Sequence, residues 1–152
     1  MTANKRRTRK GFTFVEVLFA IFLVVTSATI ALATMPLSTS ARVKADLNNR
    51  ATSLAQKQLE AIRGRGYANA TAAQLLSLGL IDSTTEVTPS TYAFTNNDNA
   101  ALDNPAKVLP QGTGTVKVEQ VDLDLRRITI TVTWVDRGTT RSMVVGTLIA
   151  NL

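Results

Sequence analysis

The apolar run from Phe12 to Met35 contains one ionisable side chain, the carboxylate of Glu16. Inside a membrane-spanning helix such a carboxylate costs on the order of 2.5–3.5 kcal/mol, and residues of this kind are usually functional and paired. The residues within one helical turn of Glu16, among them Phe12 and Ala20, include no cation. We therefore expect the partner of Glu16 to come from another chain, or from a chemical change in this one.

A cluster of basic residues precedes the run: Lys5, Arg6, Arg7, Arg9 and Lys10. The chain has 17 Lys and Arg in all, so 12 remain beyond this cluster, against 11 Asp and Glu. A nucleic-acid-binding domain needs clustered charge on its folded part, and this balance supplies no obvious basic face. The cluster should instead keep the short N-terminus cytoplasmic and send the rest of the chain outward.

Residue types that do catalysis are scarce, because the chain contains no His and no Cys. It therefore lacks thiol nucleophiles, His general bases and the usual zinc ligand sets. The sequence also contains no phosphate-binding loop motif and no recognisable catalytic constellation. It predicts neither an enzyme nor a cofactor.

The apolar run is long enough to cross a membrane. Its 24 residues make a helix of about 36 Å at ~1.5 Å per residue, against a hydrocarbon core of ~30 Å. Two other interpretations compete: a plain single-span anchor, and a secretory signal peptide cleaved at Ala31-Leu32-Ala33. The second fits less well, because a signal core typically has about 7–15 residues and lacks a charge such as Glu16.

The segment Lys10–Leu18 (KGFTFVEVL) resembles the processing motif of type IV prepilins and type II secretion pseudopilins. The resemblance implies that a membrane peptidase removes residues 1–11 as a leader, cutting after Gly11, and methylates the new N-terminal Phe12. It implies that Glu16 acts in subunit assembly. The implied partners are sister pilins, the prepilin peptidase and the inner-membrane assembly platform, with a separate ATPase supplying energy.

Cleavage at this point would change the electrostatics of the segment. It removes the five leader cations and creates one α-ammonium on Phe12. In a staggered bundle that ammonium can meet the Glu16 carboxylate of a neighbouring subunit, and the two charges form an ion pair in a low-dielectric seam. We interpret the pair as a device that sets the register between subunits.

The helix is expected to continue beyond the run, kinked at Pro36 because proline lacks an N–H and crowds the preceding turn. From Arg42 to Arg63 apolar residues recur at spacings of three and four: Leu47, Ala51, Leu54, Ala55, Leu59 and Ile62. This stripe predicts a helix that packs on the protein's own sheet. Gly64 and Gly66 should end it.

The middle of the chain predicts less structure. Residues 71–79 should form a short helix, and residues 82–114 should be loop because they are rich in turn formers. Thr91–Thr95 could form an edge strand. Oxygen-bearing side chains are dense nearby (Asn96, Asn97, Asp98, Asn99 and Asp103), but their spacing fits no calcium-binding template, and we predict no metal.

The C-terminal part alternates apolar and polar residues around Val116–Gln120, Ile128–Trp134 and Arg141–Ile149, with a tight turn at Asp136-Arg137-Gly138. Such runs predict an antiparallel meander. The expected fold is α+β: a long N-terminal helix packed on a small antiparallel sheet, with Trp134 buried between them. The expected organisation is a leader (1–11), a transmembrane and assembly helix (12–41) and a soluble domain (42–152).

Three functions are consistent with these sequence features. The first is a structural subunit, a minor pilin because no disulfide closes a C-terminal loop, which starts in the inner membrane and ends in a periplasmic or extracellular filament. The second is a type II secretion pseudopilin. The third is a tip or competence pilin that binds DNA or a surface through Arg63, Arg65, Arg126, Arg127, Arg137 and Arg141, provided that these residues converge.

Overall fold

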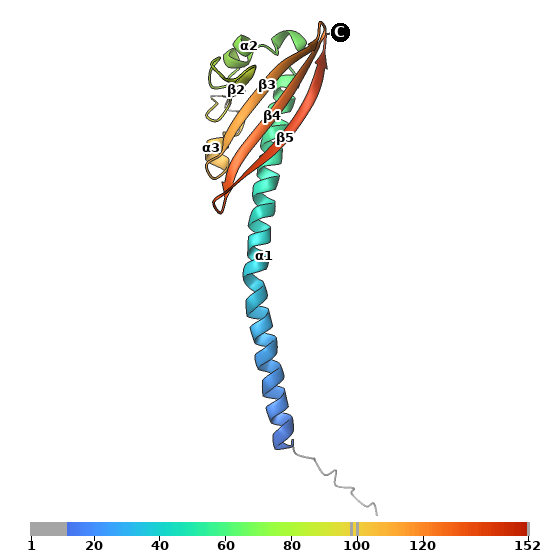
Figure 1. Cartoon of the computed structure of the whole chain (residues 1–152), viewed down its shortest axis with the longest axis vertical. Coiled ribbons are helices and arrows are strands. Elements are labelled where there is room, and N and C mark those ends of the chain that lie inside the picture. The colour runs from blue at the N-terminus through green and yellow to red at the C-terminus, as the bar shows by residue number, and fades with distance from the viewer. Residues whose placement is uncertain (1–11, 98, 100, 152) are drawn as a thin grey trace, which may run out of the picture. The chain divides into compact units, whose positions relative to one another are not determined.

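A computed structural model describes residues 12–97, 99 and 101–151. The chain divides into two compact units between Arg42 and Val43. Helix α1 (Phe14–Arg63) contributes residues to both units. The remaining helices and all five strands belong to the second unit, residues 43–152 (Figure 1).

The first unit consists, in its described part, of the N-terminal portion of α1. Its large apolar side chains are exposed, from Phe14 through Phe19 and Phe22 to Leu32. The helix contains a segment long and apolar enough to cross a membrane, and none of that segment is buried. The helix passes Pro36 without interruption, so proline does not end it, and the expected kink stays a prediction.

The second unit is built on residues 43–63 of α1. Its predicted stripe is confirmed: Ala51, Leu54, Ala55 and Ile62 are buried, while Leu47 and Leu59 are partly buried against the same core. The helix ends at Arg63, as predicted, where the amide of Gly64 donates to the carbonyl of Glu60 at 2.8 Å. Gly66 follows with a φ of 77°, which favours glycine.

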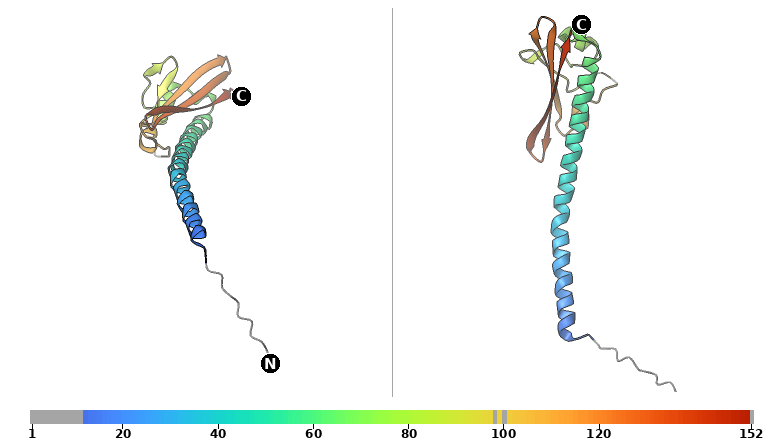
Figure 2. Two further views of the ribbon diagram at one scale, coloured as in Figure 1. Left: turned by 60° about the horizontal axis from the view of Figure 1, so that its bottom comes forward. Right: turned by 90° about the vertical axis from the view of Figure 1, so that its right-hand side faces the viewer.

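The sheet is a five-stranded antiparallel meander in the order β1-β2-β3-β4-β5. Its strands are β1 (Glu86–Thr88), β2 (Thr91–Ala93), β3 (Thr113–Asp122), β4 (Leu125–Asp136) and β5 (Thr139–Ala150). The expected α+β class is therefore correct. The right-hand view of Figure 2 shows the sheet edge-on, with the C-terminal part of α1 on one face.

The core lies between that helix and the sheet. Alternate residues of β4 point into it, and Ile128, Ile130, Val132 and Trp134 are each 2% exposed or less. Burial of Trp134 is confirmed. Gly114 of β3 is required beside them, because a Cβ there would lie 2.5 Å from the buried ring of Phe94.

The segment 82–114 is not the continuous loop expected. It contains β1, β2 and the short helix α3 (Pro105–Val108). The short strand expected within Thr91–Thr95 is present as β2, but its expected edge position was wrong, because β2 pairs with β1 on one side and β3 on the other. A side-chain cap explains why a helix forms where loop was expected. The side chain of Asn104 accepts a hydrogen bond from the amide of Ala106 at the start of α3.

Two further short elements connect α1 to the sheet. The 3-10 helix η1 (Tyr67–Asn69) precedes α2 (Ala72–Ser77), which confirms the short helix predicted within 71–79. The guanidinium of Arg126 donates to the carbonyls of Tyr67 and Ala70 at 2.8 and 3.0 Å and lies 4.3 Å from the ring centre of Tyr67. A strand residue thereby holds the η1 segment against the sheet.

Candidate assembly site

The first turn of α1 is organised by Thr13 and Glu16. The amide of Glu16 donates to the side-chain oxygen of Thr13 at 3.4 Å, and the amide of Val17 donates to the carbonyl of Thr13 at 3.2 Å. Thr13-Phe14-Val15-Glu16 has the Thr-x-x-Glu spacing of a capping box. The spacing is visible in the sequence alone, and the bond from the Glu16 amide to Thr13 explains why the helix begins here.

The carboxylate of Glu16 therefore lies at the positive end of α1. An acidic side chain in the first turn is stabilised by the helix dipole by about 0.3–1 kcal/mol when exposed. That stabilisation is smaller than the cost of placing a carboxylate in a membrane, ~2.5–3.5 kcal/mol. In a membrane the helix terminus would therefore offset only part of the cost, and the remainder would call for a counter-charge.

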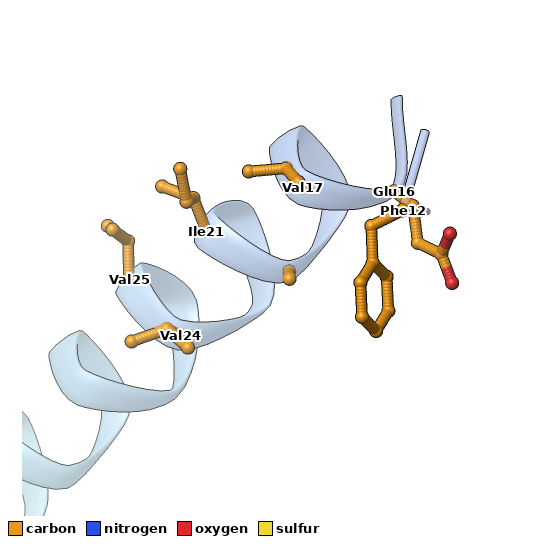
Figure 3. A pocket seen from close by; sticks show the side chains of 7 residues that line it. Phe12, Glu16, Val17, Ile21, Val24 and Val25 are labelled. Carbon is orange, nitrogen blue, oxygen red and sulfur yellow. The ribbon is translucent and has the colours of Figure 1, made fainter. Parts of the chain in front are cut away.

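A shallow groove runs along this face of the helix. It is lined by Phe12, Glu16, Val17, Ala20, Ile21, Val24 and Val25. Figure 3 shows Phe12 and Glu16 together at the start of the helix, with Val17, Ile21 and Val25 following along it. Apart from one carboxylate the groove is apolar, and its shape suits the side chains of another helix.

Within the described residues of the first unit, no cation lies near Glu16. The nearest basic residue along the helix is Arg42, about 39 Å away at ~1.5 Å per residue. Phe12, the predicted new N-terminus, is described and 80% exposed. Gly11 and the leader charges Lys5, Arg6, Arg7, Arg9 and Lys10 lie outside the described residues.

The arginines named for DNA binding do not form one patch. Arg127 and Arg137 lie near opposite ends of the β4–β5 hairpin, and ten strand residues span about 33 Å. Arg126 is engaged with Tyr67 and Ala70, and Arg141 donates to Asp136 at 3.1 Å. We expect a chain that begins at Phe12, and so lacks the basic cluster of residues 5–10, to show no salt-dependent retention on a DNA column in detergent; retention that falls as salt rises would contradict this.

The asparagine-rich segment near residues 95–104 is held by contacts within the domain. The carboxylate of Asp82 accepts from the amides of Thr95 and Asn96 at 2.7 and 3.0 Å. Asp103 accepts from Lys57 at 2.6 Å. Asp98 lies outside the described residues. Among those described, no group of three His, Cys, Asp or Glu could hold a metal ion.

Comparison with family models, with curated proteins and with solved structures finds no match to this chain.

Proposed function

We propose that this chain is a structural subunit, of the minor pilin type, of a type IV pilus or related filament. One observation carries the proposal: the groove on α1 is apolar and exposed, and a single carboxylate lies at its start, next to Phe12. The resemblance of residues 10–18 to the prepilin processing motif also supports it, through the same Phe12 and Glu16.

The groove gives this assembly a physical basis. In a bilayer, lipid tails cover apolar side chains as well as another helix does, so burial alone does not drive helices together. Close packing between helices and a polar pair must therefore supply the preference for contact with another helix over contact with lipid. Glu16 and the α-ammonium that cleavage would place on Phe12 are the two charges of such a pair. Leaving either one buried without the other costs about 3–5 kcal/mol, which favours the register that joins them.

The apolar helix and the basic cluster before it also suggest where the chain is located. The chain starts as a single-span protein of the inner membrane with its N-terminus on the cytoplasmic side, and the second unit lies outside. Extraction into a filament requires loss of the leader, because Lys5, Arg6, Arg7, Arg9 and Lys10 hold the N-terminus at the cytoplasmic surface. The same geometry serves a type II secretion pseudopilin, which is the alternative. No convergence of arginines favours a DNA-binding tip subunit.

The test is the N-terminus of the native protein, measured by mass spectrometry of the intact chain. We expect a chain that begins at Phe12 and carries one methyl group on its α-amine. Replacement of Gly11 by a bulkier residue should leave the leader in place, and Gly64→Ala is a control that should not affect processing. A chain beginning at Thr34 would indicate signal-peptide cleavage and contradict the proposal.

A further inference from the structure

The outer edge of β5 is long and open. This strand pairs with β4 from Thr139 to Ala150 in an unbroken register. It is the last strand in the sheet order, so nothing else in the sheet pairs with it. Within the described residues, no backbone hydrogen bond joins Ser142–Ala150 to any segment other than β4.

The backbone groups that face this edge follow from the turn that starts the strand. Arg137 and Gly138 have φ of 51° and 79°, and Asp136 pairs with Thr139. A two-residue turn of this kind is closed by a hydrogen-bonded pair, and such pairs alternate along an antiparallel ladder. Even-numbered residues of β5 therefore point their N–H and C=O groups away from β4. They are Thr140, Ser142, Val144, Gly146, Leu148 and Ala150.

This edge has none of the usual protection. Natural sheets blunt their edges with charged residues, proline, bulges or very short strands. Ser142–Ala150 contains no charged residue and no proline, and its register has no shift. The opposite edge differs in each respect: β1 has three residues, includes Glu86, precedes Pro89 and shows a register shift.

Side chains beside the edge also suit an added strand. Val144 and Leu148 are 56% and 53% exposed on the face of the sheet that points away from α1. Gly146, between them, opens a shallow groove that Arg127, Thr129 and Leu148 also line. A strand laid along β5 could place one side chain over Gly146 and apolar residues beside Val144 and Leu148.

We infer that the outer edge of β5 is a strand-addition site, occupied in the assembly by an extended, uncharged segment of a different subunit. The identity of that occupant as a subunit rests on the proposed function. A second copy of this chain fits poorly. Antiparallel pairing of two identical β5 edges creates a two-fold axis perpendicular to the sheet. The segments of α1 that pack on those sheets, residues 43–63, would then run in opposite directions, whereas the helices of subunits in the proposed filament run in one direction.

The test uses the full chain in detergent micelles and a peptide probe. The probe is a peptide of alternating Thr and Val, as long as Ser142–Ala150, with blocked termini. Its twin is N-methylated at every residue, so that neither edge of the twin can donate hydrogen bonds to β5. We expect the unmodified peptide to bind and the twin to bind at least about tenfold more weakly.

Substitutions at Val144 locate the binding to the edge. Val144→Pro removes an N–H that faces away from β4, and proline is tolerated on that side of an edge strand. It should weaken peptide binding by at least about tenfold while the melting curve stays close to that of the parent. Val144→Thr, which keeps the backbone groups, is the matched control and should bind like the parent. If the proline variant fails to fold, Val144→Lys replaces it in the binding measurement and should likewise weaken peptide binding.

Three results would overturn the inference: no binding of the unmodified peptide to the parent chain, equal binding by folded Val144→Pro, or self-association of the parent that Val144→Pro abolishes. The last would make a second copy the occupant. Because binding is measured on the isolated chain, its failure is distinct from a failure of N-terminal processing, which mass spectrometry reports.

Discussion

Glu16→Ala should reduce incorporation of the chain into filaments by at least about 100-fold, because an α-ammonium left unpaired in an apolar seam costs about 3–5 kcal/mol. Membrane insertion should survive, since the substitution removes a charge from an apolar segment. The start of the helix should also survive, because Glu16 contributes its amide, not its carboxylate, to the bond with Thr13. The measurement is the ratio of chain in sheared filaments to chain in membranes.

Glu60→Ala is the matched control for this experiment. Glu60 is an exposed carboxylate on the same helix, in the second unit. Its removal should leave incorporation unchanged. Glu16→Gln, which keeps the shape of the side chain and loses the charge, should behave like Glu16→Ala. Equal incorporation of Glu16→Ala and the parent chain would remove the pairing argument.

Trp134→Ala should lower the free energy of unfolding of the second unit by about 3–5 kcal/mol, the usual cost of deleting a large buried aromatic side chain. Trp134 is 2% exposed and belongs to the core cluster that includes Ile62 and Phe94. The midpoint of thermal unfolding should fall by at least about 10 °C. Circular dichroism of the full chain in detergent measures it without relying on Trp fluorescence.

Trp134→Phe separates the contribution that packing of the ring makes to stability from the cost of the unpaired indole N–H. The indole N–H of Trp134 has no hydrogen-bond partner among the described residues, and a buried unsatisfied donor costs about 1–3 kcal/mol. Phenylalanine removes that donor and fills most of the space, so its cost should be well below that of alanine. Leu123→Ala, at a residue 83% exposed, should change stability by less than about 0.5 kcal/mol. A loss from Leu123→Ala as large as that from Trp134→Ala would contradict the assignment of the core.

Long periodic segments could be predicted from the sequence because their signal repeats. The stripe from Leu47 to Ile62 repeats at helical spacing, and the alternation from Ile128 to Trp134 repeats at strand spacing. Both elements appear where expected. Glu16 could also be singled out from the sequence, because it is a single charge in an apolar run, and a lone charge is visible without any knowledge of the fold.

Short elements held by distant contacts could not be predicted from local pattern. β1 and β2 have three residues each, which is too few for a period to be recognised. They exist because β2 pairs with β3, more than twenty residues further along the chain. The carboxylate of Asp82 likewise orders the turn at Thr95 and Asn96 through contacts across thirteen and fourteen positions. Neither partner in such a pair indicates the other in the sequence.

Residue type and order were enough to establish the membrane-length helix, its acidic first turn and the α+β class, because hydropathy and period are properties of consecutive residues. The tertiary structure alone decided which arginines were engaged, that Thr91–Ala93 lies inside the sheet, and that β5 presents an open edge. Those features depend on which strands become neighbours, and strand pairing is a relation between residues far apart in the chain.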